Sequence, residues 1–333
     1  MSTDGRLIED NVRVRRFEVD SNFDGWRLDK YLANRIEGLS RSKAGRIAKG
    51  DHVEVIPRRK IKAGTKLRDG DRVVLREYLA PERVQDHQVE ILYEDEALLV
   101  INKPAGMLAQ ETATVRLNTV KYFLRRQGLE EAEPVHRLDR ETSGVMICAR
   151  TKEFAPPLCA QFAGQGPQKI YRALVVDTQA RWQPGDRQRL DSGLGFEQDS
   201  ALPHRVWSGD WEAITHVEAM GRRDHRMGEL ADLRIRIETG RQHQIRVHLA
   251  MENTPVAGDK LYSYDDQFFM DICDHPQHEE LRSRLHFPRQ SLDAQKIGID
   301  HPLSGEPLKV EAPLPGLWDM PATDTDCDSG ESR

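Results

Sequence analysis

One charged loop carries the residue types best suited to covalent chemistry in this sequence. Residues 136–144 (HRLDRETSG) place Asp139 shortly before the apolar run at residues 145–149. A loop that leads into a strand holds its side chains at the edge of a sheet, where they can meet a substrate. A carboxylate there could attack a sugar carbon or remove a proton, as carboxylates do in glycoside hydrolysis. Asp139 is therefore the first candidate for a catalytic residue.

Two later segments supply partners for such a carboxylate. Tyr171 lies in residues 169–173 (KIYRA), and Arg241 and Arg246 lie in residues 239–249 (TGRQHQIRVHL). Each residue type alone has an ordinary structural explanation. An aspartate in a turn commonly caps it, a tyrosine on an apolar strand is commonly core, and arginines on an exposed helix are commonly solvated. The ordered occurrence of all three segments in one chain favours a shared site.

Taken together, the three segments resemble the signatures of the RluA-like pseudouridine synthases. Shorter matches support the resemblance at residues 103–106 (KPAG), 258–262 (GDKLY) and 312–315 (APLP), and it covers nearly all of residues 24–318. Enzymes of this family break the N-glycosidic bond of an RNA uridine, rotate the base and rejoin it through C5. The resemblance therefore implies an isomerase that acts on RNA and needs no cofactor.

The resemblance also implies roles within the site. Asp139 would be the catalytic carboxylate, as a nucleophile at C1′ or as a base at C2′, and the sequence leaves both roles open. Arg246 would pair with Asp139, lower its pKa and fix its orientation. The ring of Tyr171 would pack against the flipped uracil, and its hydroxyl could assist proton removal at C5. Arg137 would fill the space that the flipped base leaves or bind a phosphate, and Arg241 would contact the RNA.

The charge of the chain is unevenly distributed. The whole sequence has a net charge of -6, but residues 24–78 contain fifteen Lys+Arg against eight Asp+Glu. This basic segment, predicted as two helices followed by two strands, resembles an S4-type RNA-binding domain. Four cations recur along its second helix and would face RNA phosphates, which give affinity and orientation rather than sequence choice. They are Arg41, Lys43, Arg46 and Lys49.

The periodicity of apolar residues predicts an α+β protein. Helices are expected at residues 28–36, 43–49, 119–127, 152–162 and 242–251, and strands at 53–56, 72–75, 89–93, 98–102, 145–149, 169–176, 212–219 and 229–238. The larger domain should therefore contain a mixed, largely antiparallel sheet flanked by helices, beside a small α/β S4-like domain. The expected parts are an N-terminal tail or short lead-in strand (1–20), the S4-like domain (21–79), a linker (80–88), the synthase domain (89–318) and an acidic disordered tail (319–333).

Composition argues against several other classes of protein. The sequence contains no run of about 18 apolar residues, so no membrane span is predicted. The polar N-terminus lacks the apolar core of a secretion signal. Four cysteines without a C-x-x-C pair predict a reducing compartment, the cytoplasm, and no zinc site. His243 and His248 are five residues apart and do not share a helix face, so no metal site is expected there. A monomer is expected.

The family resemblance implies a pseudouridine synthase whose substrate is a structured RNA. Large-subunit (23S) ribosomal RNA is the expected substrate, because family members with an appended S4-type domain usually act on it. A tRNA pseudouridine synthase is the alternative within the enzyme class. A non-catalytic RNA-binding factor of ribosome assembly is the alternative outside it. The target uridine is left open.

Overall fold

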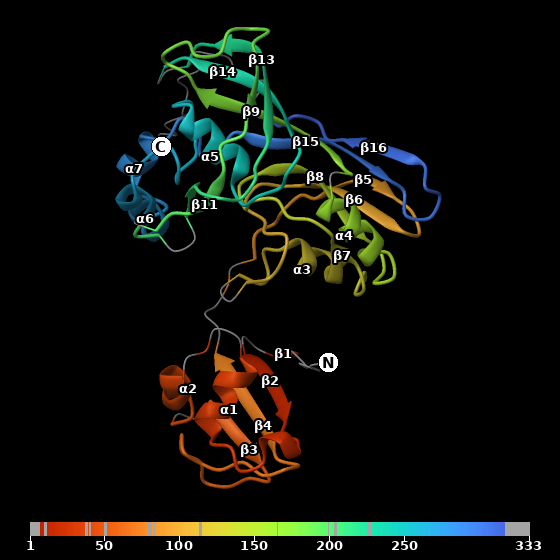
Figure 1. Cartoon of the computed structure of the whole chain (residues 1–333), viewed down its shortest axis with the longest axis vertical. Helices are drawn as coiled ribbons and strands as arrows, with labels where there is room; N and C mark the ends of the chain where they lie inside the picture. The colour runs from red at the N-terminus through yellow and green to blue at the C-terminus, as the bar shows by residue number, and fades with distance from the viewer. Residues whose placement is uncertain are drawn as a thin grey trace, which may run out of the picture. The chain divides into compact units, whose positions relative to one another are not determined.

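The chain folds into two compact units that divide between residues 83 and 84 (Figure 1). The computed structural model describes residues 7–316 except 10–11, 37–38, 40, 50–51, 79–81, 83, 113–114, 165, 199, 203–204 and 226–227. The acidic tail expected at residues 319–333 lies outside the described residues, as do residues 1–6 of the expected N-terminal tail. Among the described helices, none is both long and apolar enough to cross a membrane.

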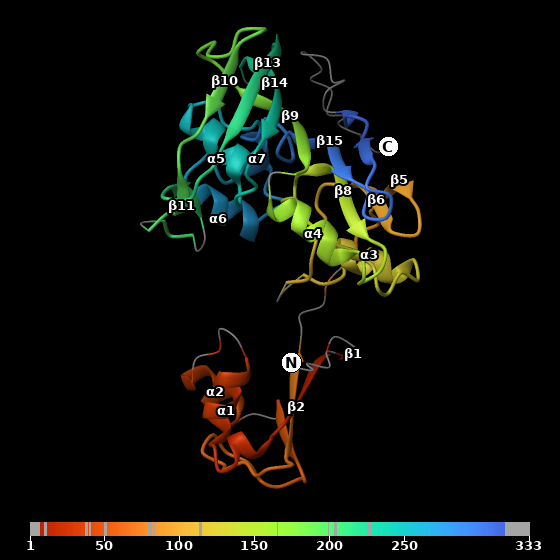
Figure 2. The same cartoon turned by 45° about the vertical axis from the view of Figure 1, so that its right-hand side comes forward.

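The smaller unit is an antiparallel sheet with two helices on one face. The sheet order is β1 (Leu7–Glu9), β2 (Val12–Glu18), β4 (Arg72–Tyr78) and β3 (Val53–Ile56). A 3-10 turn, η1 (Ser21–Phe23), precedes α1 (Leu28–Arg35) and α2 (Arg41–Ile47), which lie against the sheet (Figure 2). Leu28, Tyr31 and Leu32 share the buried face of α1, as their spacing predicts. The helix predicted at residues 43–49 is observed as α2 over Arg41–Ile47, so both of its ends lie two residues nearer the N-terminus than predicted.

Of the two structures predicted for residues 1–20, a tail or a short lead-in strand, residues 12–18 form the strand. β2 pairs with β4 along its whole length, from Val12 opposite Tyr78 to Glu18 opposite Arg72. Phe17 is buried in the core of the smaller unit. The strand is hard to recognise locally because adjacent arginines interrupt its alternation, and its partner strand lies far along the chain.

The larger unit is built on one mixed sheet, as predicted. Its strands are Glu90–Glu94 (β5), Leu98–Lys103 (β6), Glu133–Pro134 (β7), Ser143–Ala149 (β8), Gln168–Val176 (β9), Arg187–Leu190 (β10), Thr215–Arg223 (β13), Leu230–Ile237 (β14), Leu292–Asp300 (β15) and Pro307–Glu311 (β16). The order is β10-β13-β14-β9-β15-β8-β6-β5, with β16 beside β15 and β7 beside β8. β15 and β8 run parallel, and the other neighbours among the described strands are antiparallel. A separate ribbon joins Leu194–Phe196 (β11) to Val206–Ser208 (β12).

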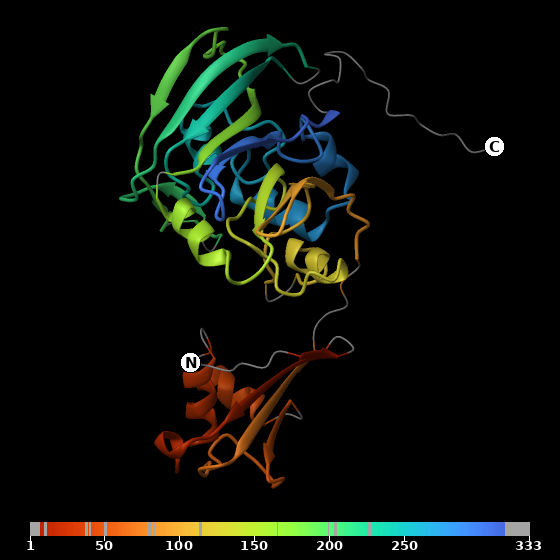
Figure 3. The same ribbon diagram turned by 90° about the vertical axis from the view of Figure 1, so that its right-hand side faces the viewer.

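Helices cover the two faces of this sheet. α3 (Val120–Arg126) and α5 (Gln244–Met251) contribute to the same core as Leu99 of β6 and Tyr171 of β9. α4 (Ala155–Ala163) packs with Leu98 and Val100, which alternate to the opposite face of β6. The teal strands β13 and β14 arch over the cyan helix α5 (Figure 3). α6 (Asp266–Asp274) and α7 (Glu279–Ser283) lie near each other in a smaller cluster.

Part of the predicted linker belongs to the larger unit. Residues 84–88 form no helix or strand, but the amide of Gln85 donates to the side chain of Asn118 at 2.8 Å. His87 lies beside Gly106. The lack of periodicity predicts an irregular segment, but it does not reveal that residues 84–88 pack against a domain. Residues 80, 81 and 83 of the predicted linker lie outside the described residues.

A glycine sets the distance between the two parallel strands. Gly144 of β8 has a φ of 109°, which side chains rarely adopt. A Cβ at this position would lie 2.3 Å from the carbonyl oxygen of Ala294 in β15. Glycine therefore allows β15 to pair closely with the strand that follows Asp139.

Replacing Gly144 with alanine should lower the free energy of unfolding by about 2–4 kcal/mol, because the new Cβ must displace backbone and adopt a disfavoured φ. Gly221→Ala is the matched control, since a Cβ there would meet nothing within 4 Å, and it should change the free energy of unfolding by no more than about 0.5 kcal/mol in either direction. Urea unfolding measures both variants. An equally small decrease in both would show that the close approach at Gly144 does not constrain the fold.

Candidate active site

The loop that carries Asp139 is anchored to the preceding KPAG segment. The loop leads into β8, whose residues are all buried. Lys103, fully buried at the end of β6, donates to the carbonyls of Met107 at 2.9 Å and Arg140 at 3.4 Å. Burial lowers the pKa of Lys103 to about 7, despite the opposing effect of the Asp139 charge. One enclosed amine therefore joins the two segments beneath the candidate carboxylate.

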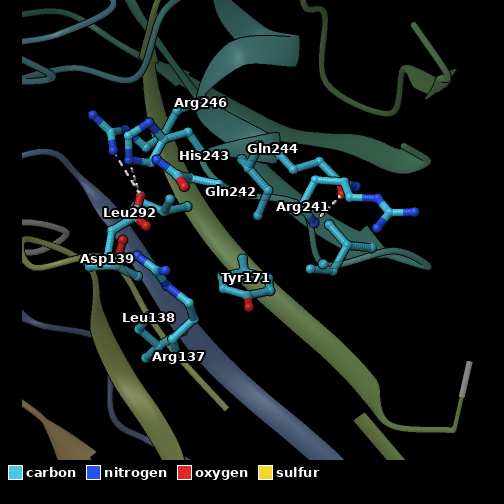
Figure 4. A pocket seen from close by; sticks show the side chains of 14 residues that line it. Arg137, Leu138, Asp139, Tyr171, Arg241, Gln242, His243, Gln244, Arg246 and Leu292 are labelled. Carbon is cyan, nitrogen blue, oxygen red and sulfur yellow. Dashed lines mark hydrogen bonds and ion pairs between the residues drawn. The ribbon is translucent and has the colours of Figure 1, made fainter. Parts of the chain in front are cut away.

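Arg246 holds Asp139 with one nitrogen of its guanidinium. Arg246 projects from α5 with 8% of its surface exposed, and its Nη1 donates to Oδ2 of Asp139 at 2.8 Å (Figure 4). This is the ion pair predicted from the sequence. Its Nε and Nη2 bind the two carboxylate oxygens of Asp259 at 2.6 and 2.9 Å. Because a guanidinium is planar, fixing two nitrogens on Asp259 fixes the direction of the third.

Asp259 is itself held by the backbone. It is fully buried, and its Oδ1 accepts the amides of Leu261 at 2.9 Å and Tyr262 at 3.1 Å. Gly258 precedes it with a φ of 79°, and a Cβ there would lie 2.1 Å from the carbonyl oxygen of Arg289. The GDKLY segment therefore uses its glycine for a close backbone approach and its aspartate to orient Arg246.

Two opposing effects set the pKa of Asp139. Burial raises it, but the charge of Arg246 and the hydrogen bond from Arg246 contribute to a net shift below the ordinary value. The carboxyl is therefore ionised at neutral pH. Because the folded-state pKa is lower than the unfolded one, the ion pair stabilises the fold above the unfolded pKa. That contribution disappears as the pH falls through the folded pKa.

His243 lies beside the same carboxylate. Its Nε2 is 3.9 Å from Oδ2 of Asp139, and its Nδ1 is 2.8 Å from the hydroxyl of Tyr262. Burial, and then the charge of Arg246, lower the pKa of His243 to about 4, so the ring is neutral. The Tyr262 oxygen accepts the amide of Val206. The Tyr262 hydroxyl can donate its proton to Nδ1, and in that tautomer the Nε2 proton of His243 faces Asp139.

Asp139, His243 and Arg246 line a cavity of about 180 Å³, which is larger than a single water needs. Tyr171 of β9 contributes an aromatic wall together with Leu138, Ile237 and Leu292. Burial, and then the charge of Asp139, raise the pKa of Tyr171. The phenol therefore keeps its proton at neutral pH. This favours the predicted packing of the ring and disfavours the hydroxyl as a base.

Arg137 and Arg241 are exposed residues of the cavity lining. Arg137 lies two residues before Asp139, and its charge also contributes to the lowered pKa of that carboxyl. Arg241 donates from Nε to the carbonyl of Glu212 at 3.0 Å. It lies on the side of Tyr171 away from Asp139 (Figure 4). The structure therefore brings together five of the residues singled out from the sequence: Arg137, Asp139, Tyr171, Arg241 and Arg246.

The other predicted RNA-binding residues belong to the smaller unit and do not line this cavity. Arg41, Lys43 and Arg46 are exposed on α2, and Lys49 is exposed just beyond its end. Nε of Arg41 lies 3.6 Å from the carboxylate of Asp29. The four predicted cations are therefore exposed along α2 and just beyond it, and their contact with RNA stays a prediction.

Lys103, His243 and Asp259 are site residues that the sequence did not predict. Each of the three lies in a segment that resembles a family motif. For Asp259, the match of residues 258–262 (GDKLY) is the sequence feature that could have indicated a role in the site. His248 is buried and bonds the hydroxyl of Thr215 and the carbonyl of Ser192, both at 2.9 Å. Among the residues the structure describes, no group of three or more His, Cys, Asp and Glu side chains could hold a metal ion.

Comparisons with known proteins identify the family. Residues 97–251 match the family model described as RNA pseudouridylate synthase. A protein of Pseudomonas aeruginosa, named ribosomal large subunit pseudouridine synthase D, is 33% identical over 319 residues, covering 91% of this chain and 94% of that protein. The chain belongs to the RNA pseudouridylate synthases. It is accordingly an isomerase that acts on uridine in RNA.

Two further comparisons agree with this family. A protein of Xanthomonas campestris pv. campestris with the same name is 33% identical over 313 residues, covering 91% of this chain and 89% of that protein. The solved structure of human RNA pseudouridylate synthase domain containing 1 matches with a TM-score of 0.53 and 21% identity, over 70% of this chain and 86% of that chain. The predicted family and fold class are confirmed. The non-catalytic alternative is therefore not retained for this pseudouridine synthase.

Proposed function

We propose that this synthase isomerises specific uridines of large-subunit (23S) ribosomal RNA, with Asp139 as its catalytic carboxylate. The observation that carries the proposal is an ionised carboxylate held in one orientation beside an aromatic wall. Oδ2 of Asp139 is bound by Arg246, whereas Oδ1 accepts no hydrogen bond from any described residue. Oδ1 is therefore the oxygen available to a bound nucleoside.

The reaction must break the C1′–N1 bond and form a C1′–C5 bond. In one route, Oδ1 of Asp139 adds to C1′ as N1 leaves, and C5 of the rotated uracil later displaces the carboxylate. In the other, Oδ1 removes the C2′ proton to give a glycal, and the proton returns when the base rejoins through C5. In both routes, the proton that C5 loses balances the one that N1 gains. Both routes use the same oxygen of Asp139, so the proposal keeps both.

The neighbouring residues would position the flipped base. The ring of Tyr171 packs against uracil once the nucleotide has left the RNA stack, a step that costs a few kcal/mol. Arg137 occupies the vacated space in the stack or binds a phosphate, and Arg241 contacts the RNA from the other side of the ring. The raised pKa of Tyr171 supports a role for its ring rather than for a phenolate.

The substrate part of the proposal rests on the relatives. The Pseudomonas and Xanthomonas proteins are both named for the large ribosomal subunit, and each aligns with about nine-tenths of this chain. Transfer RNA is the alternative substrate.

We also propose that the smaller unit is an S4-like RNA-binding domain. Its support is a helix pair against an antiparallel sheet, the basic surplus of residues 24–78, and exposed cations along α2. Contacts of this kind supply affinity and orientation rather than sequence choice.

We further propose that the protein works in the cytoplasm, as a monomer and without a cofactor. Cys148, Cys159 and Cys273 are free thiols, as suits a reducing compartment. The isomerisation requires neither redox nor phosphate energy.

Cells that lack this protein should lose pseudouridine at defined positions of large-subunit ribosomal RNA, and the wild-type gene should restore them. Asp139→Asn should restore none, because an amide can neither add to C1′ nor take up a proton at C2′, although RNA binding should survive. Carbodiimide-based mapping of ribosomal RNA and tRNA measures both. Missing sites confined to tRNA would overturn the substrate proposal. Equal rescue by both forms would overturn the role of Asp139.

Replacing Arg41, Lys43, Arg46 and Lys49 with glutamine in the full chain should weaken RNA binding. The plot of log Kd against log salt should flatten by about 0.7 for each phosphate that the protein no longer neutralises. A matched variant neutralises four exposed cations of the larger unit and should change both quantities less. These are Arg126, Lys152, Arg282 and Lys309. Equal effects of the two variants would show that α2 has no special part in binding.

A further inference from the structure

Lys169 is a buried cation to which the site described so far gives no role. It is 9% exposed and lies on β9. Lys169 and Tyr171 are buried, whereas Ile170 and Arg172 are partly exposed, so the first two project from the same face of the strand. Two residues of a strand span about 7 Å. Lys169 is therefore one step along the strand from the aromatic wall of the cavity.

The ammonium of Lys169 lies between the cavity lining and an aromatic pair. A Cβ at Gly240, which lines the cavity, would be 3.7 Å from Nζ. Nζ is 5.6 Å from the ring centroid of Phe162, which stacks on His136 with centroids 4.4 Å apart. Because His136 directly precedes Arg137, Nζ lies close to both loops that carry the exposed arginines of the cavity.

This cation has no counter-charge within the described part of the chain. No described carboxylate lies within 4 Å of Nζ, no described acceptor receives a hydrogen bond from it, and burial alone lowers its pKa. By contrast, Lys121, Lys260 and Lys296 each contact a carboxylate. Although the Lys169 side chain is largely buried, its Nζ atom is not completely enclosed, so a ligand in solvent can reach it. A largely buried cation without a partner is costly, which indicates a ligand that brings negative charge.

We infer that Lys169 binds a backbone phosphate of the RNA next to the target uridine. The inference rests on the proposed function, since a uridine on Tyr171 carries phosphodiesters on either side of its ribose. An ammonium is a compact charge that suits a single phosphate oxygen. The Phe162 ring lies beneath it and stabilises the charge while the phosphate is absent. Lys169 would thereby fix the RNA strand relative to Asp139.

The test is RNA affinity of the full-length protein, with a labelled ribosomal RNA stem-loop that contains a mapped uridine. Lys169→Met should raise Kd about tenfold, flatten the salt dependence by about 0.7 in the logarithmic slope, and raise KM more than it lowers kcat. Lys169→Arg should recover most of the affinity. Lys296→Met is the matched control, because Lys296 lies on neighbouring β15 opposite Ile170 and is paired with Glu311.

A methylphosphonate placed at each phosphate that flanks the uridine identifies the ligand. At one of the two positions, the methylphosphonate should raise the Kd of the wild type as much as Lys169→Met does. The same modification should not raise the Kd of the Lys169→Met protein further. Unchanged Kd in Lys169→Met, or a decrease in kcat alone, would overturn the inference. The inference would also be overturned if the methylphosphonate and Lys169→Met had additive effects on Kd at every phosphate. It would be overturned as well if inorganic phosphate competed with RNA equally for the wild type and for Lys169→Met. Absence of pseudouridine with wild-type enzyme would refute the proposed function instead, because the affinity measurements do not depend on turnover.

Discussion

The site depends on one buried guanidinium shared between two carboxylates. Arg246 is removed from water and binds Asp139 on one side and Asp259 on the other. Burying such charges is favourable only when every partner is well placed, and removing one partner of a buried pair costs about 3–5 kcal/mol. Asp139, Arg246 and Asp259 carry a net charge of about -1. Oδ1 of Asp139, which accepts no hydrogen bond from a described residue, presents this negative charge to the cavity. A negative site of this kind stabilises the positive charge that develops at a sugar carbon as its glycosidic bond breaks.

The sheet supplies the close approaches that this arrangement requires. Asp139 precedes β8, Tyr171 lies on β9, and Arg246 comes from α5 on the same face of the sheet. Gly144 lets β15 approach β8, and Gly258 lets the Asp259 turn approach the carbonyl of Arg289. At both positions a side chain would push apart backbone segments that are distant in sequence. The two glycines are therefore required for the backbone arrangement that positions the charged residues of the site.

Local patterns predicted the parts of the fold that local forces determine. The apolar face of α1 and the helix at residues 152–162, observed as α4 over Ala155–Ala163, were predictable because helix periodicity acts over a few residues. The contact between Asp139 and Arg246 followed from family resemblance, not from spacing. The pairing of β2 with β4 and the bracing of Arg246 by Asp259 depend on segments meeting in space. A sequence likewise shows that residues 103 and 169 are lysines, but not that Lys103 is enclosed by carbonyls and that Lys169 has no carboxylate partner among the described residues.

The central claim is that Arg246 keeps a partly buried Asp139 ionised and oriented. The most direct test is NMR titration of the carboxyl carbon of Asp139 in the wild type, in Arg246→Lys and in Arg246→Met. In the wild type, the pKa of Asp139 should lie below the ordinary value of about 3.9. In Arg246→Met, burial acts without its main opposing charge and should raise the pKa above that value, with Arg246→Lys between the two. The same pKa in all three proteins would contradict the claim.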